Sequence, residues 1–293
     1  LPSWTPGTPG YAFVLGMHAF GLEECNQYPE AEDTARASLS LHPENPWAVH
    51  ALAHVLEMQG RVEEGIEHLE SGAQLWAPDS GFAYHNWWHL ALFYLDRADD
   101  DAVLKLFDRE LAEPEARFAL NMIDAAALLW RGHLLGIEIG VRAEPVADWW
   151  RAQIEEGAAY YAFNDFHAAV AFALAEDMES LAALSERIER EPADSGLGSV
   201  NRAIGAPLVK AMTDYVRGDF GTCAAAMTDL RDAAQAFGGS HAQRDLITLT
   251  LMDAAARSGN LPLAKHYLNE RRVMKPSSTL GDRLETQLRT LSA

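Results

Sequence analysis

Residues 46–96 read PWAVHALAHVLEMQGRVEEGIEHLESGAQLWAPDSGFAYHNWWHLALFYLD and decide the fold. Two segments of this stretch share one spacing, in which two large apolar residues precede a small residue and a further large one. The positions are Val49, Leu52, Ala53 and Leu56 in the first segment, and Trp87, Leu90, Ala91 and Tyr94 in the second. Ala31 and Gly65 mark another small position, 34 residues apart. Small residues let two helices approach closely and large ones fill the gap to the next pair, so the stretch predicts repeated helix pairs.

The rest of the chain also has helical periodicity. No alternation of β-branched residues between turn residues indicates a strand. The spacing and the 34-residue period are those of tetratricopeptide repeats, although later units are longer, with turns at Gly218 and Gly259. First helices are predicted at residues 11–26, 46–59, 81–96, 117–135, 158–175, 202–217 and 241–258. We therefore expect an all-α protein, an α-solenoid of about seven tetratricopeptide-like pairs forming a right-handed superhelix.

Four segments are expected along this array. Residues 1–10 contain three prolines and predict an extended lead-in. Residues 11–190 would hold the N-terminal repeats, residues 191–200 a linker, and residues 201–293 C-terminal repeats packed on the same solenoid. The chain starts at Leu1 rather than Met, so we expect a leading region to have been removed.

Composition excludes several classes of function. The chain has 293 residues with 23 Lys and Arg against 43 Asp and Glu, a net charge of −20. Such a surface repels phosphate backbones and anionic lipids, so neither a nucleic acid nor a membrane is expected as a partner. Cys25 and Cys223 form no disulfide framework and no CxxC motif. We expect a cytoplasmic protein.

Histidines are concentrated on the predicted first helices, which line the concave face in such arrays. His50, His54 and Glu57 share one stripe of a helix, because their offsets are four and seven residues. Two imidazoles and a carboxylate suit a divalent metal, but Ala51 stands where a zinc-protease motif needs glutamate. Acid–base or ligand-binding work without a metal, and a merely polar groove lining, remain open as alternatives.

A second histidine pair lies one repeat further, in Tyr84–His89. His85 and His89 share a face, and adjacent first helices pack about 10 Å apart, so both pairs can converge on one ligand. Trp87 is expected in the core, whereas Trp88 is a candidate stacking wall and Asn86 a candidate ligand contact. A satisfied histidine between helices is an equal alternative for His89.

Two further groups combine polar residues with apolar surroundings. Asp124 lies in an apolar helix, where it either orients a histidine or pairs with Arg131. Asn164 either caps a helix, with His167 three positions on, or belongs with Asp165 and His167 to a site on a helix that begins near Ala158.

The last group follows a glycine pair, in Gly238–Asp245. Ser240 and Gln243 match a capping box, which explains the serine without a catalytic role. His241, Arg244 and Asp245 are left as candidate ligand contacts, with Arg244 suited to a carboxylate or phosphate group.

Taken together these motifs resemble the tetratricopeptide repeat protein 38 family. The matching segments are MHAFGLEE (17–24), HALAHVLEM (50–58), HNWWHLALF (85–93), LLWR (128–131), NDFH (164–167) and GSHAQRD (239–245). The resemblance extends from the opening proline segment to about Pro276. It implies a helical-repeat fold and one set of family-characteristic polar residues, but no reaction.

Three hypotheses of function follow. The first is a concave site for a small polar or anionic ligand, with acid–base chemistry as an option. Its catalytic candidates are His50, His54, His85, His89, Asp124, Asp165 and His167, and its ligand contacts are Trp88, Asn86, Asn164, His241, Arg244 and Asp245. The second is a scaffold that holds a peptide or a basic partner protein in the groove. The third is a metalloenzyme on His50, His54 and Glu57; the first two hypotheses need no cofactor.

Overall fold

Helices occupy the segments in which the apolar residues recur with helical spacing. A computed structural model of the chain describes residues 3–112, 118–155, 161–190, 196–276 and 278–291. No strand occurs in these ranges, which confirms the all-α prediction. The predicted helix starts at 117 and 158 lie outside the described residues, as does the first half of the predicted linker, residues 191–195.

The chain divides into two compact units. Unit 1 comprises residues 1–114 and 272–280, and unit 2 comprises residues 115–271 and 281–293. The predicted division at residues 191–200 therefore falls inside unit 2, where residues 196–200 form a short helix, α11 (Gly196–Val200). The described part of the lead-in, residues 3–10, contains turns before the first helix, closed by hydrogen bonds from Thr8 N to Thr5 O (2.8 Å) and from Tyr11 N to Thr8 O (3.0 Å).

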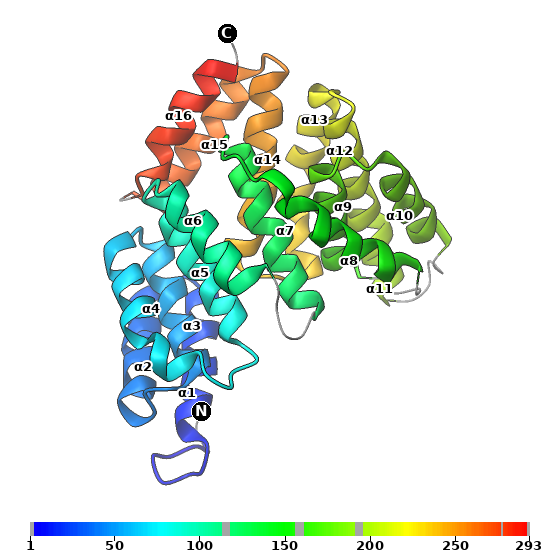
Figure 1. Cartoon of the computed structure of the whole chain (residues 1–293). Helices are drawn as coiled ribbons and strands as arrows, with labels where there is room; N and C mark the ends of the chain where they lie inside the picture. The colour runs from blue at the N-terminus through cyan, green and yellow to red at the C-terminus, as the bar shows by residue number, and fades with distance from the viewer. Residues whose placement is uncertain (1–2, 113–117, 156–160, 191–195, 277, 292–293) are drawn as a thin grey trace. The chain divides into compact units, whose positions relative to one another are not determined.

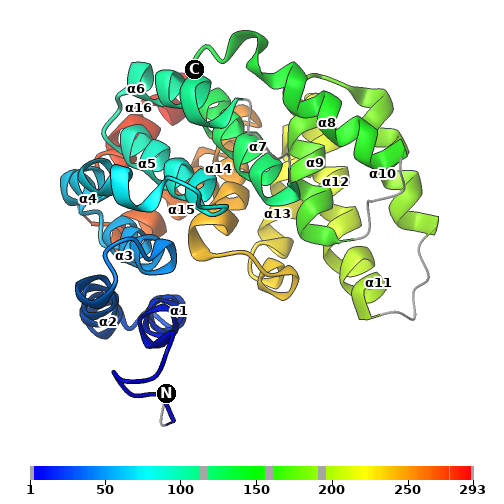
Figure 2. The same cartoon turned by 60° about the horizontal axis from the view of Figure 1, so that its bottom comes forward.

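Unit 1 is a series of helices that pack on their neighbours in sequence (Figure 1). They are α1 (Tyr11–Glu24), α2 (Tyr28–Leu41), α3 (Pro46–Met58), α4 (Val62–Trp76), α5 (Ala83–Asp96) and α6 (Asp100–Leu106), followed by a π-helical turn (Phe107–Leu111). α1 packs on α2 and α3, and α3 packs on α4 and α5. Figure 2 looks nearly along α1 and α2, which lie side by side. α3 is in the middle of the unit and is buried on every side from Ala48 to Met58.

The same turn joins the helices of successive pairs. The second residue after the first helix of a pair has a positive φ at Asn26, Gly60, Ala98, Gly136, Glu176, Gly218 and Gly259. At each turn the next N–H bonds to a carbonyl five residues back, as in Gln27 N to Leu22 O (2.9 Å) and Arg61 N to Leu56 O (2.8 Å). This arrangement satisfies carbonyls at the helix end and reverses the chain.

Unit 2 contains the remaining helices. They are α7 (Ala119–Leu134), α8 (Ala143–Glu155), α9 (Ala162–Leu174), α10 (Met178–Arg190), α11, α12 (Ala206–Val216), α13 (Phe220–Leu230), α14 (His241–Arg257), most of α15 (Leu261–Met274) and most of α16 (Leu280–Leu291). Shorter turns at Gly140–Arg142, Asn201–Gly205 and Ala233–Phe237 connect them. α9 packs between α7 and α12.

One contact in unit 2 departs from an open solenoid. In such an array each repeat touches only its neighbours, yet α7 packs against α14. The Trp130 indole donates to Thr250 Oγ1 (2.8 Å), and the Arg131 guanidinium donates to the Ala242 carbonyl (2.6 Å). Unit 2 is thus closed by its own buried polar contacts. Among the described residues, no helix has both the length and the apolar character needed to cross a membrane.

Candidate functional site

α3 and α5 carry the four histidines that lie closest together in unit 1. α3 begins at Asn45, whose side chain accepts from Trp47 N (3.2 Å) and donates to Ser38 Oγ (2.9 Å), so that the start of the helix is tied to α2. Pro46 then occupies the first turn, where its missing N–H costs nothing. This start sets the register that places His50 and His54 one turn apart on one face.

The four imidazoles form one cluster. His50, His54, His85 and His89 are 3%, 0%, 5% and 0% exposed. Ring centroids are 4.4 Å apart for His50 and His54, 4.4 Å for His54 and His89, and 4.9 Å for His50 and His85. One nitrogen from each ring lies within 4.8 Å of the others. The structure therefore brings together the two pairs that the sequence placed on adjacent helices.

His50 and His54 are buried with nitrogens that lack ordinary partners. Neither ring nitrogen of either residue has a hydrogen-bond partner among the described residues, although buried polar groups are nearly always paired. Burial and the neighbouring imidazoles lower the pKa of both rings well below 6.5. Both rings are therefore neutral near pH 7, which is the form that binds metals.

Two acidic side chains, Glu57 and Glu23, lie next to histidines of the cluster. Glu57 Oε2 lies 3.2 Å from His89 Nδ1, and Glu23 Oε2 on α1 lies 3.5 Å from His54 Nδ1. Metal-binding histidines usually donate their second N–H to a carboxylate, as His89 can to Glu57, and this fixes the ring and leaves the other nitrogen for the metal. Burial, with help from Glu24 and Glu57, raises the pKa of Glu23 to about 8.

Lys275 brings a positive charge next to Glu57. Its Nζ lies 2.8 Å from Glu57 Oε1, and both side chains are less than a tenth exposed. Burial alone would raise the pKa of Glu57, but the Lys275 ammonium and His89 hold it well below 4.5. Glu57, which the sequence suggested as a metal ligand, thus lies between a lysine and a histidine.

Aromatic rings enclose the cluster. Trp88 is fully buried and stacks on His85, with centroids 5.2 Å apart and planes at 11°; its role as a stacking wall for a ligand stays a prediction. Phe20 contacts His50 with centroids 4.9 Å apart. Asn86 is fully buried with its amide nitrogen 3.5 Å from Pro46 O. The core prediction for Trp87 is wrong in one respect, because this ring is partly exposed beside Trp76.

No protein-family model matches the chain.

The other predicted site residues belong to unit 2. Asp124, Asp165 and His167 are buried on α7 and α9. Nδ1 of His167 donates to Phe163 O (2.7 Å), and burial lowers the pKa of His167 to about 4. Asn164 does not cap α9, as the first alternative held, because Tyr161 precedes the helix and Asn164 lies within its first turn. The alternative start near Ala158 falls outside the described residues.

The capping box predicted in the segment Gly238–Asp245 is present. Ser240 Oγ accepts from Gln243 N, and Gln243 Oε1 accepts from Ser240 N, which is a complete capping box. Arg244 donates to the carbonyls of Gly238 and Gly239 and so braces the turn. His241 Nδ1 lies 3.4 Å from the Arg244 guanidinium, and Asp245 pairs with Arg271 (3.2 Å). Whether Arg244 also binds an anion stays a prediction.

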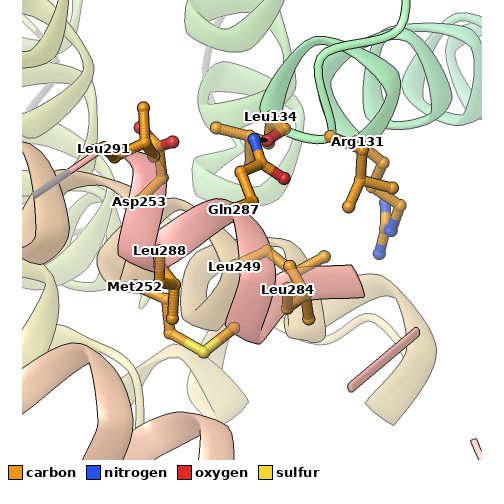
Figure 3. A pocket seen from close by; sticks show the side chains of 10 residues that line it. Arg131, Leu134, Leu249, Met252, Asp253, Leu284, Gln287, Leu288 and Leu291 are labelled. Atoms are coloured by element: carbon orange, nitrogen blue, oxygen red, sulfur yellow. Dashed lines mark hydrogen bonds between the residues drawn. The ribbon is translucent and has the colours of Figure 1, made fainter. Parts of the chain in front are cut away.

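Unit 2 also contains a small pocket between α7, α14 and α16 (Figure 3). Its lining is apolar apart from Arg131, Asp253 and Gln287, and Gln287 donates to Leu134 O. Its cavity volume is about 10 Å³, which is room for about one water molecule.

The sequence did not point to two charged residues beside the histidine cluster, Glu23 and Lys275. Glu23 had a local signal, an acidic residue in the apolar helix Tyr11–Glu24, similar to the signal that singled out Asp124. Lys275 had none, because its partner Glu57 is 218 residues away. A pocket shared by the histidines, Asp165 and Arg244 stays a prediction, because these residues belong to different units.

Proposed function

We propose that this protein binds one divalent transition-metal ion through His50, His54, His85 and His89. The supporting observation is that four buried imidazoles each offer a nitrogen within 4.8 Å of the others. Two of these rings are neutral and lack hydrogen-bond partners among the described residues. A bound ion would satisfy nitrogens whose burial is otherwise costly.

An ion fits this cluster better than an organic ligand does. The ring centroids are 4.4–5.0 Å apart, so neighbouring imidazoles are already in van der Waals contact. The space between their nitrogens suits a single ion. This proposal replaces Glu57 of the sequence-based metal hypothesis with His85 and His89.

The four imidazole ligands limit which metal ions the site would bind. Neutral imidazoles suit Zn²⁺, Cu²⁺, Fe²⁺ and Ni²⁺, whereas Mg²⁺ and Ca²⁺ prefer oxygen. Four protein ligands and almost no exposure are typical of a closed centre, which contributes to folding directly. In this proposal the metal joins α3 to α5, and Glu23 and Glu57 orient His54 and His89.

The finer fold belongs to the same proposal. We take the helix pairs as tetratricopeptide-like repeats of a right-handed superhelix similar to the tetratricopeptide repeat protein 38 family. The recurring left-handed turn, from Asn26 to Gly259, supports a repeated pair. The small-ligand and peptide-scaffold hypotheses depend on side chains of both units and stay predictions, as does a cytoplasmic location.

Metal analysis tests the central claim. Protein purified without chelator and freed of any histidine tag should contain about one transition-metal ion per chain. Apoprotein should bind Zn²⁺ or Co²⁺ with the same stoichiometry in calorimetry.

Replacing any one of the four ligands with alanine should weaken metal binding strongly. The variants are His50→Ala, His54→Ala, His85→Ala and His89→Ala. His18→Ala is the matched control, because His18 is an exposed histidine on α1. Wild-type apoprotein that takes up no transition metal would reject the proposal.

A further inference from the structure

Lys275 reaches the histidine cluster on a segment that other contacts hold in place. Ser278 Oγ donates to Asp96 Oδ1 (2.6 Å), Leu280 N donates to the same oxygen (2.9 Å), and Thr279 Oγ1 donates to Asp96 O. Asp96 ends α5, the helix of His85 and His89. The segment is thereby fixed to a helix that carries two of the four imidazoles.

Glu57 is a potential metal ligand whose oxygens are both engaged. It follows His50 and His54 on α3 at offsets of seven and three residues, which places it on the same side of the helix. Oε1 lies 2.8 Å from Lys275 Nζ, and Oε2 lies 3.2 Å from His89 Nδ1. An ionised carboxylate beside a divalent ion would otherwise bind it, since carboxylates are common metal ligands.

We infer that Lys275 keeps Glu57 off the metal and thereby holds the centre in all-nitrogen coordination. This inference rests on the proposed metal site. The ammonium neutralises the carboxylate that would be the ion's strongest oxygen donor, and it leaves Glu57 as the acceptor for His89. Lys275 is therefore a specificity-determining residue: it favours ions that prefer imidazole over ions such as Mn²⁺ that prefer carboxylate.

Without Lys275 the bound ion becomes the nearest cation to Glu57. The Glu57 carboxylate is buried, so water cannot replace the lost ammonium group of Lys275. The carboxylate should then coordinate the metal ion instead. Coordination should then change from four nitrogens to four nitrogens and an oxygen. A purely structural lysine would alter stability but not the ligands of the metal.

Cobalt spectroscopy separates these outcomes. The apoprotein is loaded with Co²⁺, whose visible absorption is more intense in four-coordinate sites than in five-coordinate ones. Wild type should show the four-coordinate spectrum and Lys275→Met the five-coordinate one. Lys275→Met should also raise affinity for Mn²⁺ relative to Co²⁺ by roughly tenfold or more. Lys265→Met, the same change at an exposed position, should match wild type.

A second substitution assigns the change to Glu57. Lys275→Met/Glu57→Gln removes the carboxylate as well and should restore the wild-type spectrum. If Lys275→Met does not fold, Lys275→Gln is used, because its amide can still donate to Glu57 without a charge. A lysine variant with the wild-type cobalt spectrum and the wild-type preference for Co²⁺ over Mn²⁺ overturns the inference. No cobalt binding by wild type overturns the proposed metal site instead.

Discussion

Glu23 Oε2 lies 3.5 Å from Nδ1 of His54, and neither side chain is exposed to solvent. The two residues come from α1 and α3, which pack against each other. The Glu23 carboxyl is held mostly protonated at neutral pH because burial raises its pKa to about 8. It therefore has opposite effects on the apoprotein, where an ionised form is costly, and on a metal centre, where a negative charge is favourable.

Glu23→Gln should separate these two effects. Between about pH 4.5 and 8 the folded state holds a proton on Glu23 that the unfolded state has lost, so this group makes apoprotein stability fall as pH rises. Glutamine removes that loss, and at pH 8 the variant apoprotein should be more stable by about 1 kcal/mol or more. Its metal affinity should fall by roughly 10–100-fold. Urea unfolding measures the stability of the apoprotein, and calorimetry measures the metal affinity. A Glu23→Gln variant that binds metal as tightly as wild type would contradict the proposal that Glu23 orients His54.

Metal removal should destabilise the protein. An ion that binds only the folded state at a free concentration 100 times its Kd adds about 2.7 kcal/mol of stability. Chelation should therefore lower Tm, and Zn²⁺ should restore it. His50→Ala/His54→Ala protein provides the control, because its Tm should not respond to either treatment. An equal response in both proteins would place the metal elsewhere.

His167 should make unit 2 sensitive to acid. Its folded pKa is about 4 and its ordinary value is 6.5, so in this window the unfolded state binds a proton that the folded state does not. Stability should fall as pH drops from 6.5 to 4, by up to about 3 kcal/mol from this residue. His167→Asn retains a donor for Phe163 O but cannot titrate. Its stability should decline less steeply over that range in denaturation series; parallel curves would show that another group is responsible.

Gly65→Ala should destabilise unit 1. A Cβ at this position would lie 2.2 Å from Cζ of Phe93, a fully buried ring on α5. The overlap should cost roughly 1–3 kcal/mol after repacking. Gly21→Ala is the matched control, because no heavy atom lies within 4 Å of its added Cβ, and alanine favours the helix by up to about 1 kcal/mol. Thermal unfolding of both variants tests the contrast, which a stabilised Gly65→Ala protein would contradict.

Local pattern explains why the helices were predictable. The first helices of residues 46–59 and 81–96 were expected within two residues of α3 and α5, because apolar spacing and Asn45-Pro46 act within one or two turns. The helical spacing also placed His50 with His54 and His85 with His89. It was less reliable for Trp87 and Trp88: Trp88 proved fully buried and Trp87 partly exposed, because neighbouring helices decide which of two adjacent rings is covered.

The sequence by itself determined the all-helical class, the paired turns and the one-turn spacing of each histidine pair, since all of these depend on residues close in the chain. Tertiary structure alone decided that Phe93 requires glycine at position 65, that α7 meets α14, and that Lys275 neutralises Glu57. Those contacts depend on the path of the backbone between distant segments. Periodicity along one helix carries no information about that path.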